Sequence, residues 1–146
     1  WYTSLDYATL FNFSLHSSYA ITSDLHWKGT LAYARGMDND KGNLPFIRPL
    51  SYQTSLHFQN GALGIQTTLN GDFEQEHYSP EYGEDLTPAY TILNLSADYS
   101  FTLNTYKTVL QVGAENVLNQ YYSTYADWGN IPRLGRNFFT SLQINF

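Results

Sequence analysis

Phe138-Phe139-Thr140-Ser141-Leu142-Gln143-Ile144-Asn145-Phe146, the last nine residues of the chain, alternate in character with a period of two. In a β-strand, successive side chains point to opposite faces. One face of this stretch would carry Phe138, Thr140, Leu142, Ile144 and Phe146. The other face turns polar toward the C-terminus. A soluble sheet that is buried on one side has the same period. The aromatic character of the apolar face favours a strand that faces lipid.

The same alternation recurs along the whole chain and predicts six more strands. Their expected ranges are about 9–19, 25–35, 50–59, 62–75, 89–101 and 108–117. Short turns are expected near residues 22–24, 60–61 and 103–105, and long loops at about 36–49, 76–88 and 118–136. A strand of ten residues tilted by about 40° rises roughly 25 Å, the height of the apolar band of an outer-membrane barrel.

These features together predict an all-β fold, the antiparallel wall of a transmembrane β-barrel with about seven up-and-down strands. Short turns on one rim and long loops on the other are typical of outer-membrane barrels. With the C-terminus placed in the periplasm, the long loops would face outward. Seven strands can enclose little beyond their own side chains. We therefore expect residues 1–146 to be the last part of a larger barrel.

Composition agrees with a strand surface in lipid. Aromatic residues make up 17% of the 146 residues and charged residues only 14%, against the roughly 25% charge of ordinary soluble domains. The net charge of −6 disfavours binding to a nucleic-acid backbone. The sequence contains no cysteine, which excludes disulfides and thiolate metal sites. It also shows neither a transmembrane helix nor a signal peptide, and since a barrel must be exported, we expect the chain to begin inside a longer one.

Three short segments resemble elements of TonB-dependent outer-membrane receptors. Glu115-Asn116-Val117-Leu118-Asn119-Gln120-Tyr121-Tyr122 resembles a signature near the end of these receptors. Ile131-Pro132-Arg133-Leu134-Gly135-Arg136-Asn137 resembles the entry into their final strand. Leu44-Pro45-Phe46-Ile47-Arg48-Pro49-Leu50 resembles their "L-P-x-I-P-P" element, although Arg48 stands where the first of two prolines is common. The segment 122–128 is similar to receptors of Bacteroidetes-type bacteria.

The resemblance implies a barrel of about 22 strands, plugged by an N-terminal domain and lying in the outer membrane of a Gram-negative bacterium. It implies TonB-driven uptake of a scarce ligand, such as an iron-siderophore, haem, cobalamin or another metal complex. Expected partners are outer-membrane lipids and lipopolysaccharide, the plug and, through it, TonB. The barrel-assembly machinery is a further expected partner, because it reads the terminal strand of the family. Neither the plug nor the TonB-contacting segment lies in this sequence.

Several loop residues have two interpretations. Tyr121, Tyr122, Tyr125 and Trp128 would either stack on a ligand or anchor the barrel at the outer interface. Arg133 and Arg136 would bind an anionic ligand or lipopolysaccharide, or, as we prefer, pair with a neighbouring carboxylate. From these residues we single out Tyr125, Trp128 and Arg133 as the possible ligand-contacting loop.

Metal binding and catalysis find little support in the sequence. Glu74, Glu76, His77, Glu81, Glu84 and Asp85 could ligate a hard cation, but polar residues in a solvated loop are the simpler interpretation. His16, His26 and His57 are expected on polar faces, where they would contact a plug or a ligand or, as we prefer, hydrogen-bond inside the barrel. No nucleophile elbow or phosphate-binding glycine loop is present, so we predict no enzyme activity, no cofactor and no resident metal.

Two alternative functions remain open. One is a passive porin or a structural outer-membrane protein, and a plug sequence upstream would argue against it. The other is a soluble β-sandwich or lipocalin-like binding domain. The aromatic-rich faces argue against a soluble domain, because they would form exposed apolar patches larger than soluble monomers tolerate.

Overall fold

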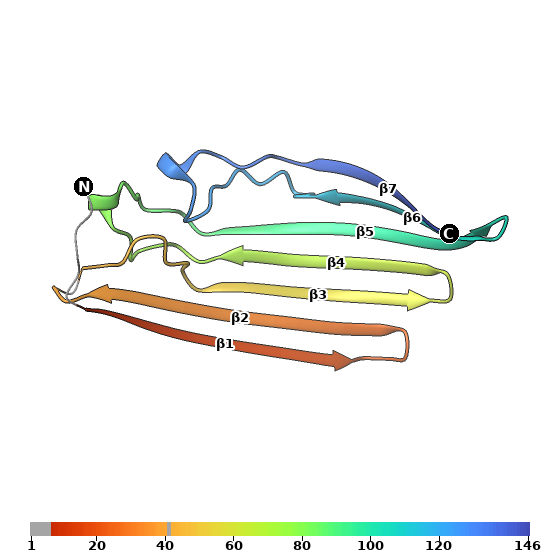
Figure 1. Cartoon of the computed structure of the whole chain (residues 1–146), viewed down its shortest axis with the longest axis horizontal. Coiled ribbons are helices and arrows are strands. Elements are labelled where there is room, and N and C mark those ends of the chain that lie inside the picture. Colours follow the sequence, from red (N-terminus) through yellow and green to blue (C-terminus); the bar gives the residue numbers. More distant parts are fainter. Residues whose placement is uncertain (1–6, 41) are drawn as a thin grey trace.

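The chain forms a single antiparallel sheet in a computed structural model that describes residues 7–40 and 42–146. The strand order in space is the order in sequence, β1-β2-β3-β4-β5-β6-β7 (Figure 1). The strands are Ala8–Ala20 (β1), Leu25–Asp38 (β2), Ser51–Asn60 (β3), Leu63–Asp72 (β4), Tyr90–Leu103 (β5), Tyr106–Glu115 (β6) and Asn137–Asn145 (β7). The prediction of an all-β chain with seven antiparallel strands is confirmed.

The connections divide into two kinds, as the sequence predicts. Tight hairpins join β1 to β2, β3 to β4 and β5 to β6 at one end of the sheet. Gly61 opens the β3–β4 turn with a φ of 54°, a conformation that glycine adopts without steric cost. Three long loops lie at the other end, 39–50, 73–89 and 116–136, and the last two contain the short 3₁₀ helices Pro80–Tyr82 (η1) and Trp128–Asn130 (η2). The C-terminus lies at the hairpin end (Figure 1).

The strand register places the apolar positions of all seven strands on one side of the sheet. Phe13 faces Tyr33, Leu31 faces Tyr52 and Leu95 faces Ala114, each pair directly across a strand boundary. We call this side the apolar face, and its main residues are Phe11, Phe13, Leu15, Tyr19, Trp27, Leu31, Tyr33, Tyr52, Leu56, Phe58, Leu63, Ile65, Leu69, Leu93, Leu95, Tyr99, Phe101, Leu110, Val112, Phe138, Leu142 and Ile144. The predicted face of each strand is confirmed by this register.

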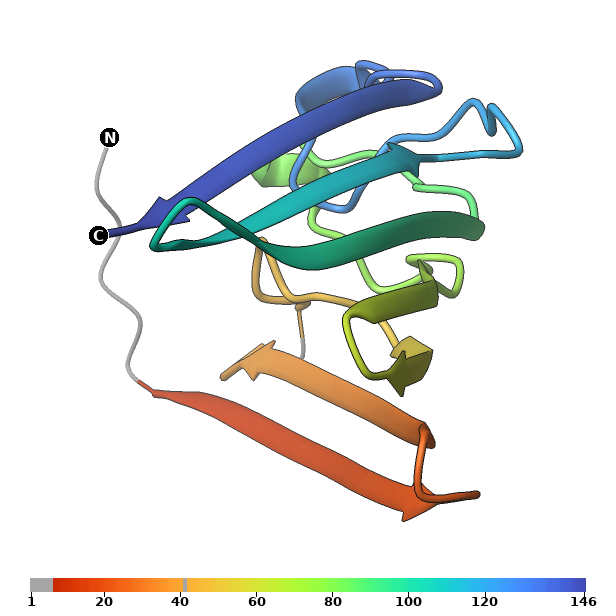
Figure 2. The ribbon, with the colours of Figure 1, turned by 90° about the vertical axis from the view of Figure 1, so that its right-hand side faces the viewer.

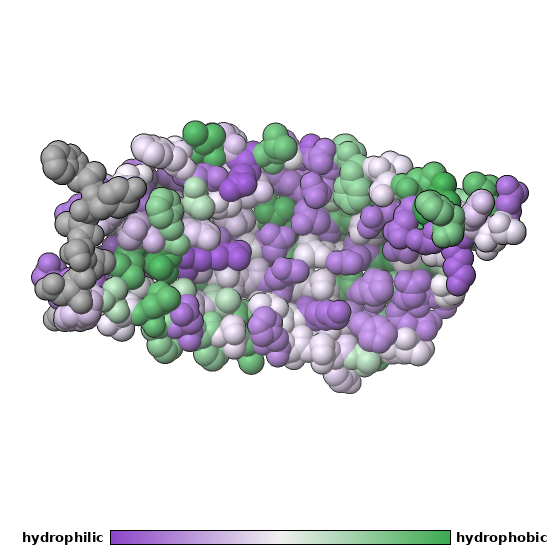
Figure 3. Space-filling view, viewed as in Figure 1, coloured by the Kyte–Doolittle hydropathy of each residue, from purple (hydrophilic) through white to green (hydrophobic). Residues whose placement is uncertain are grey.

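The opposite side, the polar face, is rich in amide, hydroxyl and imidazole groups. Its main residues are Asn12, Ser14, His16, Lys28, Thr30, Gln53, His57, Gln66, Thr68, Asn70, Asn94, Ser96, Asp98, Gln111, Glu115, Ser141 and Gln143. The sheet is strongly curved, and the long loops lie over its concave side (Figure 2). Figure 3 looks onto that side and shows mostly hydrophilic residues along the middle of the strands. The polar face is therefore the concave one.

No second layer covers the apolar face in the described residues. Its large side chains are widely exposed, for example Phe138 at 73% and Leu142 at 57%. Tyr90 and Ile92 are the only buried large hydrophobic residues among those described, and both lie at the loop end of β5. The seven strands form one sheet rather than two, so the fold is not a β-sandwich. None of the helices in 7–40 and 42–146 has the length and apolarity to cross a membrane.

At the loop end of the sheet, three strand ends differ from the sequence prediction by two or more residues, for local reasons. β4 stops at Asp72 instead of continuing to residue 75, because the chain there turns to contact the other loops. β2 runs on to Asp38, where it pairs with the first residue of β1. β6 stops at Glu115 because Asn116 adopts a positive φ of 49°, which ends the extended conformation.

Gly71 allows one close contact between strands on the apolar face. The register aligns Tyr52 of β3, Gly71 of β4 and Thr91 of β5. The Tyr52 ring lies over Gly71, and its hydroxyl group hydrogen-bonds the Thr91 hydroxyl group. A Cβ atom at residue 71 would overlap both the Tyr52 ring and the backbone of β5. The absence of a side chain therefore lets one tyrosine bridge three strands.

Candidate functional site

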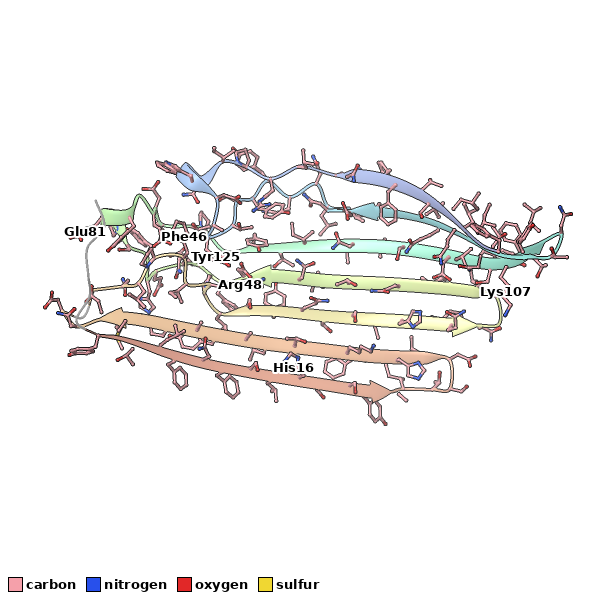
Figure 4. The ribbon with its side chains drawn as sticks, viewed as in Figure 1. His16, Phe46, Arg48, Glu81, Lys107 and Tyr125 are labelled. Atoms are coloured by element: carbon pink, nitrogen blue, oxygen red, sulfur yellow. The ribbon has the colours of Figure 1, made fainter. Side chains whose placement is uncertain are left out.

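The three long loops form the best-packed part of the described chain. Most of the buried polar residues lie in these loops or at the strand ends beside them, namely Asp72, Gln75, Ser79, Glu84, Thr87, Asn116 and Ser123. Figure 4 shows Phe46, Arg48 and Tyr125 together at this end of the sheet, with Glu81 at its margin. We call this region the loop frame. It is the candidate functional site because it combines charge, burial and converging loops.

An ion pair at the concave side ties the first loop to the sheet. The Arg48 guanidinium donates from Nε and Nη2 to Asp72 Oδ1, at 3.0 and 2.7 Å. The Tyr90 hydroxyl group donates to the other oxygen, Oδ2, at 3.0 Å. The Asp72 side chain is 4% exposed, whereas that of Arg48 is 50% exposed. The hydrogen bond to Asp72 raises the pKa of Arg48 above its ordinary value, so Arg48 stays positively charged.

Tyr122 extends this cluster into the last loop. Its ring packs on that of Tyr90 with 4.7 Å between the centroids and 36° between the planes. The packing joins the loop 116–136 to the loop end of β5. Tyr122 belongs to the segment that resembles the family motif. Through Tyr90 it contacts the Arg48–Asp72–Tyr90 cluster, and the sequence alone did not predict this contact.

Glu84 joins the first two loops. One carboxylate oxygen accepts the backbone N–H of Phe46 at 2.6 Å, and the other accepts that of Ser79 at 2.7 Å. Gln75 adds a bond from its side-chain amide to the Ile47 carbonyl oxygen, and Asn43 donates to the Tyr78 carbonyl oxygen at 3.0 Å. Glu84 is 9% exposed, so it is not the solvated loop carboxylate that the sequence suggested.

Asn130 joins the second loop to the third. Its Nδ2 donates to the Leu86 carbonyl oxygen at 2.9 Å. Its Oδ1 accepts the hydroxyl groups of Thr87 at 3.1 Å and Ser123 at 3.0 Å. The three loops are therefore linked in series by side-chain hydrogen bonds.

The family-like motif that begins at Glu115 organises the start of the last loop. The Asn116 backbone N–H donates to Asn94 Oδ1 at 2.9 Å, and the Asn116 side chain exchanges two hydrogen bonds of 2.8 Å with the Gln120 backbone. Glu115 is exposed and accepts a hydrogen bond from Asn137 at 3.3 Å. Tyr121 is 78% exposed. Asn116 therefore has a structural role in closing the end of β6.

Gly135 and Arg136 lie where the last loop returns to the sheet. Asn119 Oδ1 accepts the Arg136 backbone N–H at 2.9 Å, and a Cβ atom at residue 135 would lie 2.7 Å from that oxygen. The Arg136 side chain has no ion-pair partner within the described residues. The glycine therefore makes room for a bond that fixes the entry into β7.

The possible ligand-contacting residues are spread over the last loop. Trp128 is 80% exposed and Tyr125 is partly buried. Arg133 Nε donates to Asp127 Oδ2 at 2.7 Å, and Asp127 also accepts the Thr124 N–H and hydroxyl group at 2.7 and 2.8 Å. Arg133 is thus paired with a carboxylate of its own loop. Contact of these residues with a ligand stays a prediction.

The ionisation of Asp127 reflects that pairing. Desolvation alone would raise the pKa of Asp127, but the hydrogen bonds from Arg133 and Thr124 outweigh it. The pKa of this carboxyl group therefore lies below its ordinary value of 3.8. The loop 116–136 holds a charged carboxylate at neutral pH.

The remaining candidate groups are separated in space. Within the described residues, no three His, Asp or Glu side chains converge as a metal site would require. His16 hydrogen-bonds Thr30 across the polar face at 3.1 Å, and His26 faces His57 across the β2–β3 boundary. The polar face thus holds the histidines where the sequence expected them.

The predicted assembly strand forms one edge of the sheet. Phe138, Thr140, Leu142 and Ile144 lie on the apolar face of β7, in register with Ala114, Val112, Leu110 and Thr108 of β6. Phe146 follows the strand and is fully exposed. Neither β7 nor β1 has a strand partner on its outer side within the described residues.

Comparison with known proteins shows similarity at the level of structure. No family model matches the chain, and no curated protein sequence matches it. Among solved structures the chain is similar to the copper transporter OprC, with a TM-score of 0.86 over 95% of this chain and 21% sequence identity. The chain spans 24% of the length of that protein. At this identity the likeness shows the fold, a curved meander of long strands.

Proposed function

We propose that the chain is the C-terminal part of a TonB-dependent receptor and forms about a third of an outer-membrane β-barrel wall. It would lie in the Gram-negative outer membrane and take up a scarce ligand, most simply a metal complex. The resemblance of three segments to that family and the likeness to a copper transporter support this proposal. Its polar face would line a lumen, and the loop frame would face outward.

The observation that carries the proposal is the uncovered apolar face. An exposed apolar area that spans seven strands is far larger than soluble monomers tolerate, and lipid is the solvent that matches it. Aromatic side chains gather near both ends of this face, such as Phe11 and Phe13 toward the loops and Tyr19 and Tyr99 toward the hairpins. Phe11 and Tyr19 are eight residues apart. At about 3.3 Å per residue and a tilt of about 40°, they lie roughly 20 Å apart along the membrane normal, close to the height of an outer-membrane apolar band.

The partners follow from this placement. The apolar face would contact outer-membrane lipids, with lipopolysaccharide at the loop end. The plug domain would lie inside the barrel, on the concave side of the sheet, and TonB would act on the transporter through the plug. The barrel-assembly machinery would recognise β7. In such a protein the loops and the lumen bind the ligand, and no chemical conversion is needed.

A labelling experiment on adjacent residues tests the lipid-facing side. Residues 1–146 contain no cysteine, so Leu95→Cys and Ser96→Cys each introduce the single thiol of this part of the protein, one on each face of the interior strand β5. A fluorophore attached at residue 95 should be quenched by brominated lipids, and one at residue 96 should not. Equal quenching at both residues would reject the barrel orientation.

The mass of the protein in washed outer membranes tests the larger claim. A species about four times the 16.7 kDa of this chain and carrying this C-terminus would agree with a plugged receptor, since the chain spans 24% of OprC. A species near 16.7 kDa would reject the receptor proposal.

A passive porin is the second candidate function. It is favoured by an open hollow of about 400 Å³ on the polar face, lined by Gln53, Gln66, Asn70 and Asn94 among others. Uptake of the same solute in cells with and without TonB separates the two functions. Loss of uptake without TonB supports a receptor, and unchanged uptake supports a porin.

A further inference from the structure

A second hollow, of about 250 Å³, lies on the concave side between β1 and the first loop. Ala32 and Ala34 are consecutive polar-face residues of β2, and their small side chains leave this space open. Asn12 and Ser14 of β1 line one side, and Arg48 and Ser51 line the other. We call it the Arg48 hollow. Its volume is near the small end for ligand pockets, so it suits one group of a ligand rather than a large ligand.

The Arg48 hollow offers hydrogen-bond donors that are not engaged elsewhere in the described residues. Within the described residues, the side chains of Asn12 and Ser14 make no hydrogen bond to the protein. Arg48 is held by Asp72 through Nε and Nη2, which leaves Nη1 unengaged. The Asp72 carboxylate is buried, whereas the Arg48 guanidinium is half exposed. The carboxylate therefore holds the guanidinium in position while one side of it stays accessible. No carboxylate lines the hollow in the part of the chain that the structure describes.

We propose that the Arg48 hollow binds a single anionic group, a carboxylate or a phosphate, of the transported ligand. The unengaged Nη1 of Arg48 can donate charge-assisted hydrogen bonds to such an oxyanion, and the Ser14 hydroxyl and Asn12 amide groups can donate further ones. The inference deepens the proposed function, on which its biological meaning rests, by naming a class of ligand.

The surrounding charge limits that class to small or singly anionic groups. Glu74, Glu76, Glu81 and Asp85 make the second loop acidic, and the whole chain has a net charge of −6. The net negative charge of the chain repels polyanions as they approach. Recognition of the anion therefore depends on short-range hydrogen bonds in the Arg48 hollow.

Calorimetric titration with inorganic phosphate tests the proposal on the intact protein in detergent. Saturable binding with a Kd on the order of 1 mM is expected for such a small probe. Arg48→Gln should weaken binding about tenfold or more, because a charge-assisted hydrogen bond is lost, and Arg48→Lys should weaken it less. Arg35→Gln is the matched control, since Arg35 lies opposite Phe11 on the apolar face, and it should leave binding unchanged.

Ala34→Leu is the second variant, because Arg48→Gln could also disturb Asp72. It fills the hollow while leaving the ion pair intact, and it should weaken phosphate binding as strongly as Arg48→Gln. Absence of saturable binding by the natural protein, or natural affinity in Ala34→Leu, overturns the proposal. Natural affinity in Arg48→Gln overturns it as well. The lipid-quenching experiment on residues 95 and 96 is independent of these variants, so failure of the barrel proposal would be recognised separately.

Discussion

Replacement of Glu84 by alanine should release the first two loops from each other. The carboxylate accepts one backbone N–H from each loop, at 2.6 Å from Phe46 and at 2.7 Å from Ser79, and it is 9% exposed. Alanine removes both acceptors and leaves two amide donors without partners. The effect should be local, because the strand register does not involve Glu84.

The size of the effect follows from the two lost bonds. A hydrogen bond to a charged group contributes about 1.5–3 kcal/mol. The freed loop segments regain conformational entropy, which offsets part of that loss. We therefore expect the free energy of local opening to fall by about 2–4 kcal/mol. This corresponds to an opening constant about 30 to 700 times larger, at about 1.4 kcal/mol for each factor of ten.

Amide hydrogen exchange measures this opening at the two donors themselves. Exchange at Phe46 and Ser79 should accelerate by that factor in Glu84→Ala, and by less in Glu84→Gln, which keeps one acceptor oxygen. Glu81→Ala is the control, because Glu81 lies three residues earlier and is exposed. Unchanged exchange in Glu84→Ala, or equal acceleration in Glu81→Ala, would refute the argument.

Three further perturbations probe other parts of the chain. Phe146→Ser should lower the amount of protein in washed outer membranes, measured by immunoblot, far more than it changes ligand affinity; normal amounts would contradict an assembly role for the terminal strand. The lowered pKa of Asp127 means that its stabilising contribution is present above about pH 4 and is lost as the pH falls through that pKa. Trp128 fluorescence should therefore change below about pH 4 and stay constant from pH 5 to 8, and a transition near neutrality would argue against this origin. Gly71→Ala should displace Tyr52 and cost about 1–3 kcal/mol by overpacking, seen as a lower unfolding midpoint in detergent, and an unchanged midpoint would show that the strands can adjust.

The strands and their faces could be predicted from sequence because both depend on a local period of two. The apolar positions of each strand are visible without knowledge of its neighbours, and the register then brings them together. The strand ends were less predictable. Asp72 continues the alternation of β4, yet β4 ends there because the residues that follow turn to hydrogen-bond the other loops. Asn116 interrupts β6 through a backbone conformation that no periodicity reveals.

The contacts of the loop frame could mostly not be predicted from sequence, because they join residues far apart in the chain. Glu84 looked like one of several solvated carboxylates, and its two backbone donors come from different loops. Asp72 and Tyr90 had no local pattern that singled them out. Arg48 did carry a signal, since it replaces a proline that is common in the resembled element, and the structure shows what that residue contacts.

The links between the loops also bear on how this surface can change during evolution. Glu84, Asn43 and Asn130 each bind a backbone atom of another loop, at Phe46, Tyr78 and Leu86 respectively. Backbone atoms are present whatever the side chain, so the partner residues can mutate while the links persist. A surface under selection by phages, antibodies or new nutrients could therefore exchange its exposed side chains and keep its architecture. Insertions or deletions between the linked residues would be tolerated less well than substitutions.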